Sequence, residues 1–461
     1  MSFIKVQSVC EECGRPVQAE YIRRDQEVYL EKNCPAHGAS RALASEDADA
    51  FERWIAFPSV TIPPRVFLSK GAKHKGDGSF CVPGDSECPL HCGPCENHLM
   101  TACCVLLNVT DRCNQRCPWC FAEAKHNGDG SFCVDEHKKN RPRCVDDPPI
   151  SEIGKWLDRL IELGEERKFN IQLSGGEPTV RDDLSEIIAL CKKKEFEYTQ
   201  LNTNGRKLAE DPEYAKSLRA AGLSTVFLQF DGVDDDVYKA LRGEPLFEIK
   251  KAAIRNCGDA GLPVTLVPTV LKNVNLSQTG AIIDFMLDNI RTVKGVHFQP
   301  ASFFGRHEGG EGERVTMFKV MEEIEKQTNG RVKKADLAPI STGHPLCCFC
   351  AAYMKESDGE LRPLRSGGSC CPEEPLEIIR RDRDFVLNKW EVSDPDAAAP
   401  EASSFDEALA VFKANMFTIS GMAFMDKRNL DAERLRRCRV QVFSRDERLI
   451  PFCAYYSKGE K

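Results

Sequence analysis

Cysteines at short spacing are the most chemically informative feature of this sequence. Three of them lie in the segment Cys113-Asn-Gln-Arg-Cys117-Pro-Trp-Cys120. Three thiolates in one loop can hold three irons of a cubane cluster and leave the fourth iron open to another molecule. A structural zinc site is the alternative, although a closed zinc site usually takes four ligands. The loop is therefore a candidate open metal centre.

A second group precedes this loop and repeats its spacing. Cys88, Cys92 and Cys95 are followed a few residues later by Cys103 or Cys104. Four thiolates can close a cubane completely, which suits electron transfer or structure better than substrate binding. A zinc site built from the same residues is the competing interpretation.

The N-terminal group has the spacing of a small metal-binding domain. Cys10 and Cys13 precede a predicted hairpin over 17–32, and Cys34 and His37 follow it. Two ligand pairs presented by a hairpin match a zinc ribbon or a rubredoxin-like site. The mixed set of three cysteines and one histidine favours Zn²⁺ slightly over mononuclear iron, and the site is expected to be structural.

Composition limits what the whole chain can do. The 461 residues are 41% hydrophobic and 29% charged, which is typical of a globular protein of several domains. With 63 basic and 71 acidic residues the net charge is −8, so nucleic acid is not an expected partner. The sequence has neither a transmembrane run nor a signal peptide, which predicts a cytoplasmic protein. In a reducing compartment, its 23 cysteines are expected to bind metal rather than to pair.

The middle of the chain alternates between β-rich runs and amphipathic helical patterns. Strands are predicted at 103–110, 170–174, 197–202, 224–230, 264–270 and 295–300. Helices are predicted between them at 153–166, 182–194, 213–222, 247–261 and 277–289. Because parallel strands need crossover connections, this alternation predicts an α/β fold with a six-unit partial (β/α) barrel.

The ends of these predicted strands carry further candidate site residues. Active sites of β/α barrels gather at the C-terminal ends of the strands, where the Cys113 loop is also expected. Gly175, Gly176 and Glu177 follow the second strand, and the glycines would let the backbone approach a ligand while the carboxylate accepts hydrogen bonds from an ammonium group. Polar residues that could bind a ribose or a substrate, or form a satisfied buried network, follow the next two strands: Asn202, Gln229 and Asp231.

Together these two loops resemble the radical S-adenosylmethionine (SAM) superfamily. The resemblance implies that Cys113, Cys117 and Cys120 ligate a 4Fe-4S cluster whose unique iron chelates the methionine part of SAM. It also implies that the segment Gly175-Gly176-Glu177-Pro178 binds the amino group of SAM and that Trp119 lies near the adenine.

Other segments resemble one subgroup, which includes archaeal tetraether lipid synthase and related pterin methylase-like proteins. These segments are 88–98, 344–347, 436–440 and 450–456. The resemblance implies that Cys347, Cys438 and Cys453 ligate a second auxiliary cluster. Its fourth ligand is open between Cys350 and Cys371. The repeated segments 73–82 and 125–134 depart from the subgroup pattern, and they are either duplicated surface loops or matched ligand loops.

We therefore predict a partial (β/α)6 radical SAM barrel between a small metal-ribbon domain and a C-terminal auxiliary-cluster domain. The predicted divisions are a ribbon domain at 1–50, a connecting segment with cluster ligands at 51–101, the barrel at 102–335 and the auxiliary-cluster domain at 336–461.

The resemblance implies an enzyme that cleaves SAM reductively to a 5′-deoxyadenosyl radical, which then abstracts hydrogen from an unactivated C–H bond. The first hypothesis is carbon–carbon bond formation on an apolar, lipid-like substrate. The second is radical methylation of a small heterocycle with a second SAM or a folate-type donor, and the third is a noncatalytic electron-transfer protein. An external one-electron reductant is expected, no nucleic acid or transmembrane segment is expected, and peripheral membrane contact is left open.

Overall fold

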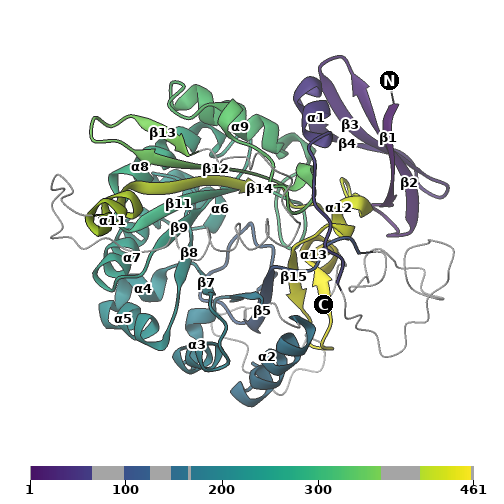
Figure 1. The fold of residues 1–461 in the computed structure, drawn as a ribbon. Coiled ribbons are helices and arrows are strands. Elements are labelled where there is room, and N and C mark those ends of the chain that lie inside the picture. The colour runs from purple at the N-terminus through teal and green to yellow at the C-terminus, as the bar shows by residue number, and fades with distance from the viewer. Residues whose placement is uncertain (1, 65–97, 125–146, 165–167, 365–404, 458–461) are drawn as a thin grey trace.

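The computed structural model describes residues 2–64, 98–124, 147–164, 168–364 and 405–457. Within these ranges, every helix is too short or too polar to cross a membrane. Cys88, Cys92, Cys95, Cys371 and both repeated segments lie outside the described residues. The chain forms a small antiparallel sheet and a large curved sheet (Figure 1).

The small sheet is the N-terminal ribbon. Its strands pair in sequence order: β1 (Ser2–Val9), β2 (Pro16–Arg24), β3 (Glu27–Cys34) and β4 (Gly38–Ser45). The predicted hairpin is β2 and β3, and it turns at Asp25, whose φ is 55°. Buried Ala19 and Tyr21 alternate with partly or fully exposed residues, so one face of the sheet packs inward. Helix α1 (Ala48–Ile55) follows, and its Phe51 and Trp54 rings lie against Phe318 of the barrel.

All six predicted barrel strands form. They are β5 (Cys104–Thr110), β6 (Asn170–Gly175), β7 (Thr199–Thr203), β8 (Thr225–Gln229), β9 (Val264–Val267) with the short β10 (Thr269–Val270), and β11 (Val293–Pro300). Successive strands from β5 to β9 pair in parallel, and β11 pairs in parallel with β9. The α/β partial-barrel prediction is confirmed.

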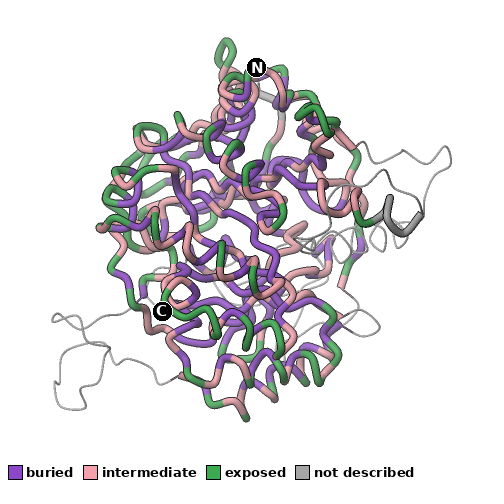
Figure 2. Tube along the Cα trace, turned by 90° about the vertical axis from the view of Figure 1, so that its left-hand side faces the viewer, coloured by how far each residue is buried: buried purple, intermediate pink, exposed green. Residues whose placement is uncertain are grey.

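Helices cover the outer face of this sheet (Figure 1). They are α2 (Ile150–Gly164), α3 (Leu184–Lys193), α4 (Arg206–Glu210), α5 (Pro212–Ala221), α6 (Asp235–Arg242), α7 (Phe247–Asp259), α8 (Thr279–Asp288) and α9 (Met317–Gln327). Fully buried strand residues such as Leu173 and Leu201 share one core with Leu157 and Ile187 on these helices. Figure 2 shows the buried segments running through the middle of the molecule.

The C-terminal segments extend both edges of the barrel sheet. Strand β14 (Met416–Met422) pairs in parallel with β11, and β15 (Val440–Phe443) pairs in parallel with β5. The antiparallel strands β12 (Cys348–Lys355), β13 (Leu361–Leu364) and β16 (Leu449–Pro451) lie further out. The predicted boundary at 335/336 therefore does not separate two sheets, because strands on both sides of it belong to the same one.

Short elements complete the described fold. These are η1 (Pro178–Val180), η2 (Leu276–Gln278), η3 (Glu311–Glu313), η4 (Lys334–Asp336), η5 (Pro345–Cys347), α11 (Phe405–Asn415), α12 (Ala432–Arg436) and α13 (Phe452–Ser457).

Candidate active site

The cysteine loop lies directly after β5 and is held on both sides by backbone hydrogen bonds. On one side, the N–H of Gly176 donates to the Thr110 carbonyl at 2.8 Å, and that of Glu177 donates to the Arg112 carbonyl at 2.8 Å. On the other side, Cys120 and Arg306 exchange backbone hydrogen bonds of 2.8 and 3.0 Å. The backbone itself therefore fixes where Cys113, Cys117 and Cys120 sit.

Gly175 and Gly176 are required by this close approach. A Cβ atom on Gly175 would lie 2.1 Å from the Thr110 carbonyl oxygen, and one on Gly176 would lie 2.1 Å from that of Arg112. Gly175 also has a φ of 124°, which side-chain-bearing residues rarely adopt. The sequence suggested that these glycines admit a ligand; in the structure they admit the backbone of the cysteine loop.

Glu177 is almost fully buried and its carboxylate is engaged within the chain. It accepts hydrogen bonds from the Thr179 N–H at 3.0 Å and the Thr179 hydroxyl at 2.6 Å. It also accepts from the Thr203 hydroxyl and the Asn204 N–H, both at 2.7 Å. The carboxylate therefore joins the ends of β6 and β7, and its predicted contact with the SAM amino group stays a prediction.

The three cysteines of the loop are partly buried, and their thiols are not packed around one point. Burial, followed by the charge of Glu177, raises the pKa of Cys113, and burial also raises that of Cys117 against the opposing effect of Arg242. In the described part of the chain, the N-terminal ribbon holds the only set of three or more Cys, His, Asp or Glu ligand atoms that lie within 4.8 Å of one another. The three loop thiols are therefore more widely spaced than this. Because two ligands of one zinc ion at about 2.3 Å cannot be more than about 4.6 Å apart, the loop does not fit the alternative of a single zinc ion.

Asp231 and Arg242 form a buried ion pair that anchors the same loop. Arg242 donates to Asp231 through Nε at 2.7 Å and Nη2 at 2.8 Å, and through Nη1 to the Trp119 carbonyl at 2.9 Å. Burial alone would lower the pKa of Arg242, but Asp231 raises it. The Asp231 side chain also bonds to Gln229 and to the N–H of Thr269. Asp231 was predicted as a site residue from its strand end, whereas Arg242 was missed.

Lys250 on α7 is a second residue that the sequence did not reveal. Its ammonium group is fully buried and donates to the Asn204 carbonyl at 2.6 Å and to Gln229 Oε1 at 2.9 Å. Burial, offset in part by Asp231, lowers the pKa of Lys250 to about 7. The sequence gives one indication of this burial: Lys250 is spaced so that it shares a helix face with Ala253, Ile254 and Cys257, which are the other buried residues of α7.

Trp119 lies on the outer side of the loop. Its ring is 5.9 Å from those of Phe303 and His307, and a Cβ on Gly309 would lie 2.5 Å from the indole. A pocket of about 330 Å³ opens beside the same segment and includes Phe303, His307 and Tyr456 in its lining. This volume lies in the range of small-molecule sites. The predicted place of Trp119 beside an adenine stays a prediction.

Asn202 belongs to a polar ladder on the inner face of the sheet. Its Oδ1 accepts from Gln172 at 2.7 Å and from Gln200 at 3.2 Å, and its Nδ2 donates to Ser174 at 3.3 Å. Cys104 extends the ladder by donating to Gln172 at 3.4 Å. Cys104 therefore faces the barrel interior.

The predicted ribbon ligands converge as a single site. Cys10, Cys13, Cys34 and His37 place their ligand atoms within 4.8 Å of one another. His37 Nδ1 is 3.5 Å from the sulfur of Cys10 and 3.5 Å from that of Cys34. Three sulfurs and one ring nitrogen this close fit one tetrahedral ion.

Sequence comparisons match both the barrel and the ribbon. A model of the radical SAM superfamily matches residues 107–286, and a model described as the HMPTM N-terminal zinc ribbon domain matches residues 3–46. A 7,8-dihydro-6-hydroxymethylpterin dimethyltransferase of Methanocaldococcus jannaschii is 30% identical over 501 aligned residues, covering 98% of this chain and 93% of that protein. This chain belongs to the radical SAM superfamily.

More distant matches cover a smaller share of the chain. A GTP 3′,8-cyclase of Petrotoga mobilis is 26% identical, covering 61% of this chain and 84% of that protein. The crystal structure of methylornithine synthase matches with a TM-score of 0.35 at 15% identity, covering 63% of this chain and 83% of that one. The family assignment rests on the sequence relatives.

The chain is a radical SAM enzyme with an N-terminal zinc ribbon. Enzymes of this superfamily use a 4Fe-4S cluster and SAM, and the cysteine loop fits that requirement because it offers three thiols spread more widely than one ion would need. Cys113, Cys117 and Cys120 are the residues that would hold the cluster.

The predicted C-terminal cluster stays a prediction. Cys347, Cys438 and Cys453 come from separate segments, and the charges of Cys453 and Cys347 contribute, after burial, to raising the pKa of Cys438. Cys350 lies on β12 opposite Ser420 of β14. Cys103 lies just before β5, but its predicted partners are outside the described residues.

Proposed function

We propose that this radical SAM enzyme adds a methyl group to a carbon of a small polar heterocycle of the pterin class. The observation that carries the proposal is the inner face of the barrel, where partly exposed positions bear amide, imidazole and hydroxyl groups. These positions are Gln172, Asn202, Gln229, His297, Gln299 and Ser420.

Polar groups of this kind match the edge of a heterocycle better than an alkyl chain. Gln172 and Asn202 are 2.7 Å apart, and His297 Nδ1 is 2.9 Å from the Ser420 hydroxyl, so both pairs are fixed before a substrate arrives. Amides donate and accept, as ring nitrogens and carbonyls do, whereas an apolar chain would desolvate them without giving partners. Phe227, whose ring is 6.0 Å from that of His297, adds a flat surface for stacking.

The relative from Methanocaldococcus jannaschii supports this choice, because its name gives a pterin as substrate and methyl transfer as reaction. The first hypothesis from the sequence, carbon–carbon bond formation on a lipid-like substrate, finds no comparable apolar surface among the inner positions named above. The noncatalytic hypothesis is not retained, since the chain belongs to a family of enzymes.

In this proposal, different residues of the site have different roles. Cys113, Cys117 and Cys120 hold the cluster, and Glu177 with the Asp231–Arg242 pair keeps the surrounding strand ends in register. When bound, the reduced cluster and SAM supply one-electron cleavage of the sulfonium and a 5′-deoxyadenosyl radical that removes a hydrogen atom. The inner face orients the heterocycle and excludes water. The methyl group comes from a second SAM or a folate-type donor, and the electron comes from an external reductant.

We further propose two auxiliary clusters. Cys347, Cys438 and Cys453 would be the ligands of one, which is supported by the charges of Cys453 and Cys347 acting on the buried Cys438. Cys88, Cys92, Cys95 and Cys103 are the ligands of the other, on the basis of their spacing.

The test is a product assay. The enzyme is reconstituted anaerobically, reduced with dithionite and given SAM with a deuterated methyl group, 6-hydroxymethyl-7,8-dihydropterin and, in parallel, an unlabelled folate-type donor. We expect 5′-deoxyadenosine and a pterin heavier by one or two methyl groups, with the label identifying the donor. Cys117→Ala should give neither product.

Single-residue variants test whether the inner face of the barrel contributes to pterin methylation. Asn202→Leu removes a central amide of the ladder and should lower pterin methylation at least ~10-fold, because buried polar groups then lose partners. Gln18→Leu, at an exposed ribbon position, should leave it unchanged. A joined-chain product from an apolar substrate, without pterin methylation, would overturn the proposal.

A further inference from the structure

The C-terminal thiols lie beside a buried cation. Arg434, on α12, is 7% exposed and donates from Nε to the Cys347 sulfur at 3.4 Å and from Nη2 to the Ala423 carbonyl at 2.5 Å. The backbone N–H of Met425 donates to the Cys453 sulfur at 3.2 Å. Two N–H···S contacts therefore reach this group of thiols.

A buried guanidinium requires nearby negative charge. Taking such a charge out of water is costly unless it is paired and hydrogen-bonded. The Asp431 carboxylate, directly before the same helix, supplies one negative charge. Thiolates bound to a metal cluster would supply another beside the Nε–H of Arg434.

A polar contact from the zinc ribbon fixes the helix that carries Arg434. Asp431 Oδ1 accepts from the Glu433 N–H at 2.8 Å and so begins α12. The other oxygen of Asp431 accepts from the Tyr21 hydroxyl at 2.9 Å, and both side chains are at most 2% exposed. Tyr21 lies on β2, so a ribbon hydroxyl reaches the helix beside the C-terminal thiols.

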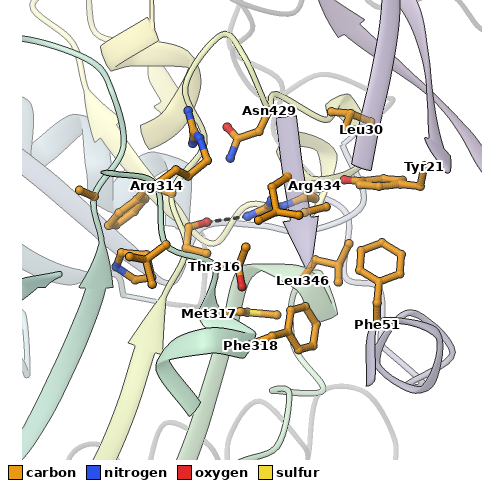
Figure 3. Close-up of a pocket in the computed structure, with 17 residues that line it drawn as sticks. Tyr21, Leu30, Phe51, Arg314, Thr316, Met317, Phe318, Leu346, Asn429 and Arg434 are labelled. Atoms are coloured by element: carbon orange, nitrogen blue, oxygen red, sulfur yellow. Dashed lines mark hydrogen bonds between the residues drawn. The ribbon is translucent and has the colours of Figure 1, made fainter. Parts of the chain in front are cut away.

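The junction is a packed contact rather than a substrate pocket. Figure 3 shows Tyr21, Phe51, Leu346 and Arg434 around a cavity of about 50 Å³. Sites for small molecules usually measure about 300 Å³ or more, so this space has room only for water. Lys32, which donates to the carbonyls of Val9 at 2.7 Å and Lys427 at 2.6 Å, holds the same two regions together nearby.

We propose that Arg434 and Tyr21 are positioning residues that raise the reduction potential of a cluster held by Cys347, Cys438 and Cys453. The inference rests on the auxiliary cluster proposed above. A positive charge and N–H donors directed at cluster sulfurs stabilise the reduced, more negative state. The zinc ribbon thereby acts on electron transfer through Tyr21 and Asp431.

The test is an EPR-monitored redox titration of the full-length protein. Cys113→Ala, Cys117→Ala and Cys120→Ala are combined to remove the SAM-binding cluster, and the C-terminal cluster is identified as the signal lost when Cys438→Ala is added. Arg434→Gln should move the midpoint of that signal to lower potential. Tyr21→Phe should move it in the same direction by less, and Arg434→Lys should retain part of the wild-type value.

The ribbon provides a matched control. Tyr29→Phe removes another ribbon hydroxyl, which donates to Glu27 at 2.6 Å, and should leave the midpoint unchanged. Zinc content confirms that each ribbon is folded, and Tyr21→Phe and Arg434→Lys decide the question if Arg434→Gln does not fold. The role proposed for Arg434 and Tyr21 is overturned by an unchanged midpoint in Arg434→Gln or by equal midpoints in Tyr21→Phe and Tyr29→Phe. Either result leaves the proposed auxiliary cluster itself intact. If Cys438→Ala removes no signal, the auxiliary cluster itself is wrong, whereas the pterin assay is decided separately.

Discussion

In the N-terminal ribbon, four ligand atoms lie within 4.8 Å of one another, and two of their residues, Cys13 and His37, are exposed. In the loop after β5, three thiols are spread more widely, and backbone hydrogen bonds to Gly176, Glu177 and Arg306 hold them. Backbone hydrogen bonds also hold the ribbon ligands, since the N–H of Cys10 donates to the Arg15 carbonyl and that of His37 donates to the Cys34 carbonyl. The two sites therefore differ in the spacing of their ligand atoms: the ribbon set is close enough for one ion, and the loop thiols are not.

The largest effect should follow removal of a catalytic thiol. Cys113→Ala, Cys117→Ala or Cys120→Ala should abolish SAM cleavage and remove about four irons per chain, because two thiolates do not retain the cluster. Cys10→Ala should lose zinc and retain at least part of the cleavage. The measurements are 5′-deoxyadenosine formation and metal content. Equal loss of SAM cleavage in all four variants would contradict the division into a structural ribbon site and a catalytic cysteine loop.

The next largest effect concerns the ion pair beneath the catalytic loop. Arg242→Gln leaves Asp231 buried without its cation, which should lower the free energy of unfolding by about 3–5 kcal/mol. Lys216→Gln breaks an exposed pair with Glu213 and should leave the free energy of unfolding nearly unchanged. Urea unfolding measures both. Similar midpoints would mean that the loop does not depend on Arg242.

A smaller loss of stability is expected when the close approach of Gly176 to the Arg112 carbonyl is blocked. Gly176→Ala places a Cβ against the Arg112 carbonyl and should cost roughly 1–3 kcal/mol of stability, with weaker SAM binding as the loops separate. A Cβ on Gly312 would have no heavy atom within 4 Å, so Gly312→Ala is the control. Thermal unfolding and SAM titration report the two effects. If Gly176→Ala keeps the wild-type unfolding temperature and SAM affinity, the close backbone approach at Gly176 does not hold the loop.

The smallest effect, taken per pH unit, is a pH dependence of the free energy of unfolding. Since the pKa of Lys250 is about 7 in the folded protein and about 10.4 in the unfolded chain, only the unfolded chain binds this proton between those values. The free energy of unfolding should therefore rise with pH across that window by at most ~1.4 kcal/mol per unit. Lys250→Met should remove this slope and Lys251→Met should keep it. Equal slopes in urea unfolding from pH 7 to 10 would contradict the assignment.

Local pattern predicted most of the barrel. The six β-rich runs became strands in which most positions are buried, as is usual in a parallel sheet covered by helices. The predicted 264–270 strand divides around Pro268, which has no N–H to donate to a neighbour. Strands β14 and β15 were not predicted, because they pair with β11 and β5, which are far away in the chain. Periodicity carries no information on such long-range pairs.

The site was predictable where ligand spacing is short. Cys113, Cys117 and Cys120 are recognisable because the loop itself sets their geometry. Arg242 and Lys250 were missed because a charged residue on an amphipathic helix normally faces solvent, and only the packed structure shows them buried. The convergence of the C-terminal thiols came from resemblance, since their spacing in the sequence predicts nothing.

The parallel pairing of β15 with β5 has a consequence for biogenesis. During synthesis, the barrel edge beside the future cluster remains without its neighbour until residues 440–443 leave the ribosome. An unpaired edge of this kind invites aggregation of the nascent chain. The β5 side of the barrel is therefore open to pairing with other chains until the C-terminal segment of the same chain reaches it.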